Sequence, residues 1–320
     1  MRVLIRLCLA LTMLCVCGHP GSAAFPDRAI RIVVPFPPGG PVDVVARIVG
    51  PKLGERLGQS VTIDNVAGDD GIKGSELVAK APPDGYTLLL GSSTHTIHPG
   101  TYGKLPFDTE KAFAPVSLLV ASQLILVVNP SLPVESVEDL IAYAKSHPGK
   151  LRYASGGRGG PTQLAFVLFK ITTGAEIINA PYDGGAAALN AIASDEAQVM
   201  LAPLVAALPM VQDGRLRALA VSGAHRALAA PELPTIAETL PGFTAVAWFG
   251  VLAPAGTPAP VVARLSAEFD HIVHDADTEK QFAAIGGEPV GGSPATFAAF
   301  IRAEIPKWIR VARETGIHIE

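Results

Sequence analysis

Two stretches of the chain place a glycine turn and a proline between a short apolar run and a longer amphipathic one. In the first stretch, residues 30–34 form the apolar run, Gly39-Gly40 follow, and Pro41 stands where a helix would begin. Glycine permits the tight turn, and proline suits the first helical position because the N–H that it lacks would have no intrahelical partner. The bare N–H groups of such a helix start bind small anions. The alternative is an ordinary strand-to-helix turn of an α/β sheet.

The residues after Pro41 have the pattern of an amphipathic helix. Asp43 would lie in its first turn, where a negative side chain complements the positive end of the helix dipole. Val45, Val49 and Leu53 recur every four residues as a stripe that we expect to be buried. The sequence therefore predicts a buried strand, a rigid turn and a helix start in this order.

A second stretch repeats this order more than a hundred residues later. Residues 151–155 predict a strand that ends in Ser155, residues 156–160 predict a glycine loop, and Pro161 predicts a helix start. The glycines lack the spacing of a dinucleotide-binding fingerprint, and no lysine follows them as in a nucleoside-triphosphate loop. Two helix starts of this kind could close on one carboxylate from opposite sides, or they could be two unrelated turns.

Hydroxyl side chains follow another predicted strand, residues 86–91. Ser92, Ser93 and Thr94 stand at its carboxyl end, the edge at which ligands gather in open α/β sheets. These side chains could hydrogen-bond a ligand, or they could cap the next turn. His95, beside them, is more typical of a hydrogen-bonded structural histidine than of a catalyst.

No stretch of the sequence predicts a catalytic or metal site. None of the serines stands in the Gly-x-Ser-x-Gly turn of a secreted α/β hydrolase. No paired histidines or clustered carboxylates have the spacing of metal ligands. We therefore expect no catalytic residue, no metal and no cofactor.

The first 24 residues have the composition of a secretory signal peptide. Arg2 and Arg6 give a basic start, and residues 7–17 form an apolar run too short to span a bilayer. The small residues 22–24 offer a cleavage site, so we expect cleavage after Ala24. The alternative is a core helix or a membrane anchor.

The mature chain would contain no cysteine, because Cys8, Cys15 and Cys17 all lie in the leader. We therefore expect no disulfide and no thiolate metal site. Without Arg2 and Arg6, 23 basic side chains stand against 29 acidic ones, a net charge of −6, and no basic run is present. We expect no nucleic-acid partner. No second apolar stretch approaches twenty residues, so we expect a soluble protein in an exported compartment.

The length of 320 residues and the alternation of predicted strands and helices indicate an α/β protein of two domains. The apolar run 124–129 predicts a strand that crosses into the second domain, and the run 246–252 predicts the strand that returns. We therefore expect domain I to comprise residues 25–124 and 247–320, and domain II to comprise residues 125–246.

Motifs spread along the whole mature chain occur together in one known family. They are residues 25–28 (FPDR), residues 34–40 (VPFPPGG) followed by Asp43 and Ala46-Arg47, residues 81–89 (APPDGYTLL), residues 128–133 (VNPSLP), residues 153–155 (YAS), residues 216–221 (LRALAV), and Trp248-Phe249-Gly250 followed by residues 253–258 (APAGTP). In this combination the chain resembles the periplasmic solute receptors of tripartite tricarboxylate transporters, the Bug-type binding proteins.

The resemblance implies a two-domain α/β fold of the periplasmic-binding-protein or Venus-flytrap type, with the ligand in the cleft between the domains. It also implies that backbone N–H groups of two loops hold the carboxylate of the ligand. The ligand-binding residues that it gives for this sequence are Phe36, Pro38, Gly39, Gly40, Pro41 and Asp43; Ser92, Ser93 and Thr94; Ser155, Gly156, Gly157, Gly159, Gly160 and Thr162; Tyr182 and Gly184; and Trp248. Trp248 could equally be an aromatic residue that packs at the hinge.

The sequence departs from the pattern of this family in the second predicted domain and in one loop of the first. The family usually has serine at Gly156 and Gly160, histidine at Gln163 and lysine at Asp183, and often an aspartate at or beside Ala202. Backbone donors survive these changes, whereas side chains that would recognise the far end of a ligand do not. We therefore keep the expectation of anion capture, and these departures weaken the case for an amino-acid or citrate-like ligand. The missing aspartate argues against a free ammonium group.

The resemblance implies an extracytoplasmic receptor, not an enzyme, that captures a small carboxylated organic solute. It would deliver the solute to the large and small integral-membrane subunits of a transporter. We expect a monomer in the periplasm that works without a cofactor. The alternative is a receptor of the same fold that signals to a membrane sensor protein, because both kinds bind a solute and then present a closed shape to a membrane partner.

Overall fold

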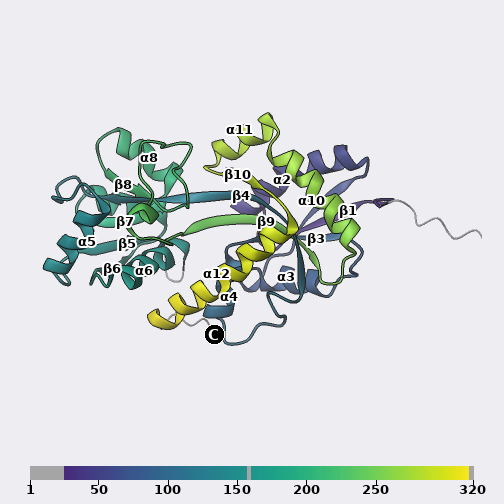
Figure 1. Cartoon of the computed structure of the whole chain (residues 1–320), viewed down its shortest axis with the longest axis horizontal. Helices are drawn as coiled ribbons and strands as arrows, with labels where there is room; N and C mark the ends of the chain where they lie inside the picture. The colour runs from purple at the N-terminus through teal and green to yellow at the C-terminus, as the bar shows by residue number, and fades with distance from the viewer. Residues whose placement is uncertain (1–24, 157–159, 317–320) are drawn as a thin grey trace, which may run out of the picture.

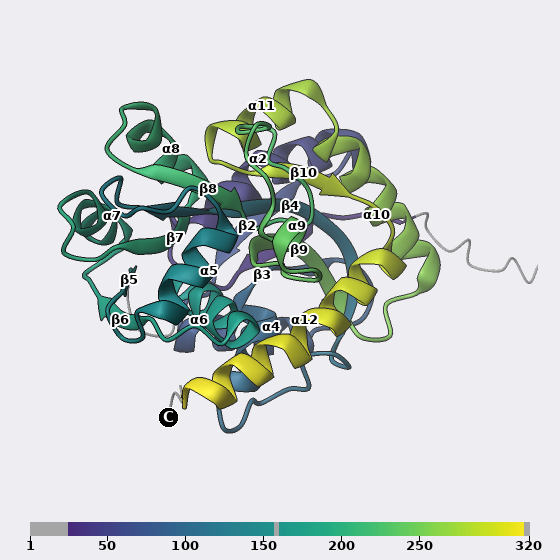
Figure 2. The ribbon, with the colours of Figure 1, turned by 60° about the vertical axis from the view of Figure 1, so that its left-hand side comes forward.

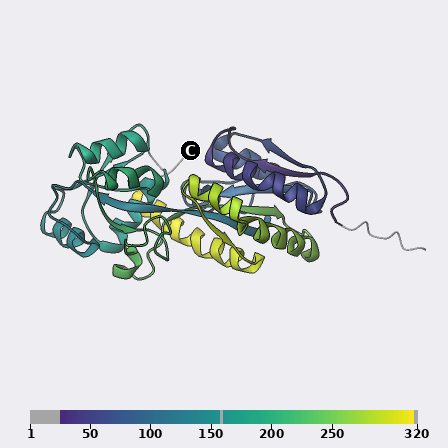
Figure 3. The same ribbon diagram turned by 90° about the horizontal axis from the view of Figure 1, so that it is seen from above.

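The computed structural model describes residues 25–156 and 160–316, so the predicted leader, Gly157 and Gly159 lie outside the described part. Within that part the chain forms two α/β halves that meet along the strands β4 (Phe113–Val128) and β9 (Val246–Pro254). Figure 1 labels these strands between the two halves, and Figure 3 shows the halves side by side.

The first half is built on a mixed sheet. Its strands lie in the order β2 (Val61–Asn65), β1 (Ile30–Val34), β3 (Thr87–Ser92), β9 and β4, and β10 (Glu288–Gly291) also pairs with β4. β1 is parallel to β2 and β3, whereas β9 runs antiparallel to β3 and β4. The carboxyl ends of β1 and β3 therefore lie at the same edge of the sheet.

The second half has its own parallel strands. β4, β7 (Val199–Pro203), β5 (Arg152–Ser155) and β6 (Ile178–Pro181) lie in that order, and β8 (Arg217–Val221) pairs with β4. β5 is parallel to β6 and β7, whereas β4 is antiparallel to β7 and β8. The loops that follow β5, β6 and β7 therefore leave this sheet at one edge.

β4 contributes to both halves. Its residues 113–123 pair with β9, its residues 124–128 pair with β7, and residues 125–128 also pair with β8. The strand thus changes partners between Gln123 and Leu124. The apolar run 124–129 of the sequence is therefore only the second part of a strand that begins at Phe113.

Helices cover the faces of both sheets. Those of the first half are α2 (Pro41–Leu57), α3 (Ile72–Ala79), which follows the short 3-10 turn η1 (Asp69–Gly71), α4 (Thr94–Thr101), α10 (Ala259–Val273), α11 (Ala276–Ala284) and α12 (Pro294–Thr315). Those of the second half are α5 (Val137–Ser146), α6 (Pro161–Thr173), α7 (Gly185–Ala193), α8 (Leu204–Gln212) and α9 (Ile236–Thr239). No helix among residues 25–156 and 160–316 is long and apolar enough to span a membrane.

The C-terminal helix α12 contributes to the cores of both halves. Phe297 and Ile301 are buried in the same apolar cluster as Trp248 of β9. Further along the helix, Trp308 and Val311 join the cluster that contains the apolar face of α6. Figures 1 and 2 show α12 lying along α4 on its way between the halves. Burial of one side of α12 therefore ties the two halves together.

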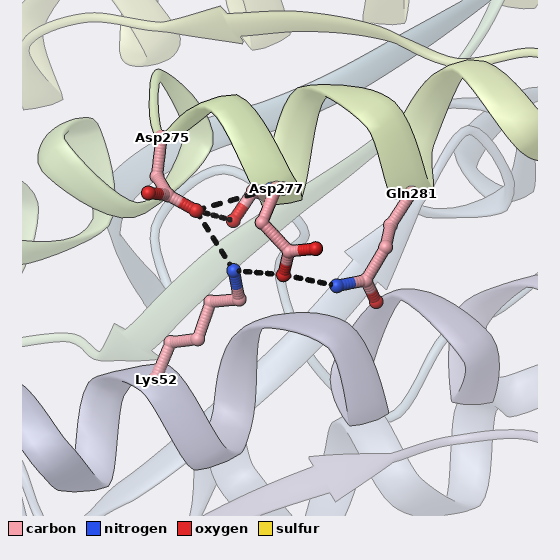
Figure 4. Close-up of polar contacts among 5 residues, drawn as sticks. Lys52, Asp275, Asp277 and Gln281 are labelled. Atoms are coloured by element: carbon pink, nitrogen blue, oxygen red, sulfur yellow. Dashed lines mark hydrogen bonds and ion pairs between the residues drawn. The ribbon is translucent and has the colours of Figure 1, made fainter.

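A cluster of charged side chains holds α11 against α2 (Figure 4). Lys52 Nζ lies 2.8 Å from Asp275 Oδ2 and 2.7 Å from Asp277 Oδ2. Gln281 Nε2 donates to the same oxygen of Asp277 at 2.6 Å. The cluster thus joins α2 to the start of α11, the helix that leads into residues 285–287.

Candidate ligand-binding cleft

A cavity of about 510 Å³ lies where the two halves meet, and both halves line it. The first half contributes the start of α2, β4, β9 and the turn before β10, and the second half contributes the starts of α6, α7 and α8. The lining residues are Gly39, Pro41, Val44, Val120, Ser122, Gln123, Leu124, Gly156, Gly160, Pro161, Thr162, Gly185, Pro203, Leu204, Val205, Ala247, Phe249, Ile285, Gly286 and Gly287. None of these described lining residues carries a charge.

The start of α2 is built by the first glycine turn. Gly39 has φ +81°, a conformation that residues with a Cβ rarely adopt, and Gly40 is the N-cap with an extended backbone. Pro41 is the first helical residue, and no side chain caps this helix. The first-turn N–H groups of Val42 and Asp43 have no intrahelical partner, because no carbonyl lies one turn earlier.

Asp43 holds the turn before α2 in place. Its carboxylate, which is only 2% exposed, accepts hydrogen bonds from Gly39 N and Arg47 Nε, both at 2.8 Å, and from Asn65 Nδ2 at 3.0 Å. Asn65 Nδ2 also donates to the carbonyl of Phe36 at 3.1 Å. The bond from Arg47, with those from Gly39 and Asn65, outweighs the opposing effect of burial and lowers the pKa of Asp43 from 3.8 to about 2. Asp43 therefore positions the turn, and the N–H of Gly39 is already used.

The start of α6 faces the cavity from the second half. Gly160 is the N-cap with an extended backbone, Pro161 begins the helix, and no side chain caps it. Thr162 Oγ1 accepts a hydrogen bond from the N–H of Gly156 at 3.3 Å, which leaves the hydroxyl hydrogen of Thr162 to donate elsewhere. Gln163, the third residue of α6, is buried and hydrogen-bonds Tyr153.

The start of α7 lies directly against the turn after β5. Tyr182 N donates to the carbonyl of Ser155 at 2.9 Å, and Gly184, with φ +92°, is the N-cap of α7. A Cβ on Gly156 would lie 2.9 Å from the backbone nitrogen of Gly185, closer than real Cβ contacts come. The absence of a side chain at Gly156 thus lets the starts of α6 and α7 approach each other.

The start of α8 is a fourth helix start at the cavity, and it was not predicted from the sequence. β7 ends at Pro203, which is the N-cap of α8, and Leu204 and Val205 follow as its first residues. The signal that could have revealed it is a proline after the apolar run 199–202. That signal is weaker than the other two because no glycine precedes the proline.

The helices that begin at the cavity are among those described helices that no side chain caps. No side chain caps α2, α6, α7 or α8, nor α3, α4 or α10. In contrast, α5, α9, α11 and α12 are capped by Ser136, Thr235, Asp275 and Ser293. Four sets of first-turn N–H groups and the positive ends of four helix dipoles therefore remain at the cavity. This arrangement suits an anionic group.

Two polar side chains of β4 that were not predicted from the sequence line the cavity where the strand changes partners. Ser122 Oγ donates to the carbonyl of Gly286. Gln123 Oε1 accepts from Gly223 N at 2.9 Å, and its Nε2 donates to the carbonyl of His225 and to Glu288 Oε2, both at 3.1 Å. The protein itself therefore uses the donors of both side chains.

Contacts between the two halves lie beside Ser122 and Gln123. Glu288 of β10 accepts a hydrogen bond from the N–H of Leu228 at 2.8 Å through its other carboxylate oxygen. Val205 of α8 packs on Gly286, where any Cβ would clash with it. Gly286 therefore permits a close contact between the two sides of the cavity.

The third predicted contact region packs inside the first half. Ser93 Oγ accepts a hydrogen bond from the backbone N–H of Trp248 at 3.0 Å, and the hydroxyls of Ser92 and Thr94 bond to each other at 3.0 Å. Trp248 is fully buried, with its ring edge-on to Phe297 at a centroid distance of 5.5 Å. These residues are not among those that line the cavity.

The structure brings together part of the predicted set. Gly39, Pro41, Gly156, Gly160 and Thr162 line the cavity. Phe36, Pro38, Gly40, Asp43, Ser155, Tyr182 and Gly184 lie in the same turns without lining it. Gly157 and Gly159 lie outside the described residues. Their contacts with a ligand stay predictions. The described residues contain no group of three or more His, Cys, Asp or Glu side chains that could hold a metal ion.

Comparison with known proteins places this chain in a family. The family model described as "Tripartite tricarboxylate transporter family receptor" matches residues 45–317. Protein BugT of Bordetella pertussis is 36% identical over 305 residues, which are 94% of this chain and 94% of BugT.

Two solved structures of relatives contain carboxylates. Rpa4515 of R. palustris with adipate is 37% identical, with a TM-score of 0.70, covering 92% of this chain and 100% of that one. MatC (Rpa3494) from Rhodopseudomonas palustris with bound malate is 31% identical, with a TM-score of 0.67, covering 90% of this chain and 100% of that one. The family and the two-domain fold that the motifs implied are thus confirmed. The chain belongs to the tripartite tricarboxylate transporter receptor family and has its α/β periplasmic-binding-protein fold.

Proposed function

We propose that this protein captures a small carboxylated organic solute outside the cytoplasm and delivers it to a tripartite tricarboxylate-type membrane transporter. The observation that carries the proposal is the cavity between the halves, with four helix starts that no side chain caps and no charge among its described lining residues. Relatives with bound adipate and malate support a carboxylate as the recognised group.

Backbone N–H groups would hold the carboxylate in this cleft. Each hydrogen bond to a charged group contributes about 1.5–3 kcal/mol, and first-turn N–H groups offer several that already point the same way. Because the groups come from both halves, a bound carboxylate would favour the closed arrangement over the open one. The N–H of Gly39 is excluded from this role, since Asp43 already accepts it.

The family comprises periplasmic solute receptors rather than enzymes. For this chain we propose a monomer of residues 25–320 in the periplasm, after removal of the leader behind Ala24. Residues 25–124 and 247–320 would move as domain I and residues 125–246 as domain II. The change of partners in β4 at Gln123 and Leu124 supports this division. The closed form would be handed to the large and small membrane subunits of the transporter.

Thermal unfolding of ligand-free protein tests the proposal. Residues 25–320 are unfolded and refolded to remove ligands carried from the host, and are then heated with hexanoate or with the uncharged hexanamide. Ligand at about a hundred times its Kd adds about 2.7 kcal/mol, which should raise Tm by roughly 5–10 °C. We expect carboxylates to produce this shift and amides not to. Equal shifts with both would contradict capture through the charge.

A pair of proline variants tests the backbone donors. Ala186 and Ala295 are exposed alanines at the second positions of α7 and α12, where proline removes one N–H that the helix does not use. A186P should weaken hexanoate binding about tenfold, because one charge-assisted bond is lost. A295P, away from the cavity, should leave the Kd unchanged, and both variants should keep the Tm of the free protein. If A186P and A295P bind hexanoate with the same Kd, the N–H groups at the start of α7 do not contribute to binding.

A further inference from the structure

One side of the cleft is lined by hydrocarbon side chains. We call the apolar wall the set of lining side chains Val120, Leu124, Val205, Phe249 and Ile285, which come from β4, α8, β9 and the end of α11. Val205 is 43% exposed and Ile285 is 39% exposed, so these two lining side chains keep apolar surface accessible. Apolar surface of this kind is stabilised when a ligand covers it.

The polar side chains beside this wall, Ser122 and Gln123, have no hydrogen left to donate to a ligand. The hydroxyl of Ser122 donates to Gly286 O. Both hydrogens of the Gln123 amide are used, one by the carbonyl of His225 and one by Glu288. A ligand hydroxyl beside these side chains would find no donor on either of them.

The backbone N–H groups in the same region are also used. Gly286 N donates to the carbonyl of Ala283 at 3.0 Å, and Gly287 N donates to the carbonyl of Phe282 at 2.8 Å. Leu124 N donates to Ser222 Oγ at 2.9 Å. Among the described lining residues, the donors that remain at the cavity are the helix starts and the hydroxyl of Thr162, which suit the charged end of a ligand.

The described walls also offer no partner for a cation on the ligand. No aspartate or glutamate stands among the described lining residues, and Ala202, at the end of β7, has no carboxylate. An ammonium group would therefore lose its water without gaining a counter-charge.

We propose that the cleft selects carboxylates whose body is an unsubstituted hydrocarbon, and discriminates against hydroxylated or aminated acids of the same length. This inference rests on the proposed function, because the carboxylate must be held by the helix starts. A hydroxyl group on the body would give up hydrogen bonds to water and face the apolar wall, whereas methylene or aromatic carbons would cover that wall.

Four acids with six carbons each distinguish the preference for an unsubstituted body from the capture of a carboxylate. Hexanoate and gluconate carry one carboxylate, adipate and galactarate carry two, and only gluconate and galactarate carry hydroxyls along the chain. Titration calorimetry on refolded residues 25–320 should give Kd values at least tenfold lower for hexanoate than for gluconate, and for adipate than for galactarate. Hydroxylated acids that bind as tightly as their unsubstituted counterparts would overturn this inference and leave the proposed function standing. If none of the four acids binds, the proposed function fails as well.

A matched pair of variants tests whether the apolar wall causes the preference for hexanoate over gluconate. Val205 and Val290 have similar exposed fractions, 43% and 40%, but only Val205 lines the cavity. Valine-to-threonine substitution keeps the approximate shape and replaces one methyl group with a hydroxyl. V205T should reduce the ratio of the gluconate Kd to the hexanoate Kd at least threefold, and V290T should leave it unchanged. An unchanged ratio in V205T, with Tm values equal to the wild type, would show that the apolar wall does not set the preference.

Discussion

The carboxylate of Asp43 accepts the backbone N–H of Gly39, four residues earlier in the chain, at 2.8 Å. The acidic side chain closest to the start of α2 is therefore turned back toward its own loop. Arg47, one helical turn later, donates to the same oxygen at 2.8 Å and neutralises the charge. An anion at this helix start would thus meet backbone donors without meeting an unpaired carboxylate.

Substitution of Asp43 should destabilise the protein. D43N keeps the size of the side chain but removes the charge that Arg47 and Gly39 bind. Hydrogen bonds to charged groups contribute about 1.5–3 kcal/mol, and we expect the free energy of unfolding in urea to fall by about that amount. D64N is the control, because Asp64 pairs with Arg31 on the surface and should contribute less than about 1 kcal/mol. Equal losses in both variants would contradict a special role of Asp43.

The effect of D43N should depend on pH. The pKa of Asp43 is lower in the folded protein than its ordinary value of 3.8. Its contribution to the free energy of unfolding is therefore complete above about pH 4 and is lost as the pH falls from about 4 to about 2. Urea unfolding at a series of pH values should show the wild-type and D43N curves converging over this interval. A difference that persists at pH 2 would mean that the charge is not responsible.

Gly156 should not tolerate a side chain. A Cβ at this position would lie 2.9 Å from Gly185 N, which is backbone and cannot rotate away. We expect G156A to lower the free energy of unfolding by about 1–3 kcal/mol, the usual cost of an overpacked site. In G40A the added Cβ would lie 3.5 Å from its nearest neighbour, the carbonyl of Pro37, so G40A should change stability little. If G156A is as stable as G40A, the starts of α6 and α7 can move apart.

The helix starts at Pro41 and Pro161 could be predicted from the sequence because they depend on residues that are neighbours in the chain. A glycine that turns the chain and a proline at the first helical position are adjacent residues, and α2 and α6 begin at these prolines. Tertiary contacts need not be known to read such a signal.

The apolar wall could not be predicted, because it assembles from segments that are far apart in the chain. Ile285 lies before β10, a strand of four residues that exists only through its antiparallel pairing with β4. Val205 can pack at the wall because Gly286 has no Cβ that would clash with it. The burial of Trp248 likewise depends on Phe297 and Phe300, about fifty residues later.

The ion cluster of Figure 4 should contribute a salt-dependent part of the stability. Lys52 is 23% exposed and joins α2 to two carboxylates of α11, so K52M keeps the aliphatic stem and removes both ion pairs. We expect K52M to lower Tm by about 1–3 °C in dilute buffer and by less in 1 M NaCl, where charges are screened within about 3 Å. K80M, which removes the pair with Glu76 within one helix, should have the smaller effect. A K52M effect that is the same at both salt concentrations would show that packing, and not charge, is lost.

Two buried histidines should make the protein less stable in mild acid. Burial lowers the pKa of His95 and of His98 from 6.5 to about 4, although the Thr109 carbonyl and Asp70, respectively, oppose the shift. Both rings therefore stay neutral in the folded protein where the unfolded chain already binds protons. The free energy of unfolding should fall as the pH drops from about 6.5 toward 4, by on the order of 3 kcal/mol for each ring.

The variant H98F separates this effect from the titration of carboxylates, most of which lies at lower pH. His98 Nε2 is buried without a hydrogen-bond partner, and the ring packs edge-on against Tyr102 at 5.0 Å, so phenylalanine preserves the contact. Between pH 7 and pH 4.5, urea unfolding of H98F should show about half the wild-type loss of stability. H147Q, which removes an exposed histidine, is the matched control variant. A wild-type slope in H98F would mean that His98 is protonated in the folded protein, which requires water or a carboxylate to reach the ring.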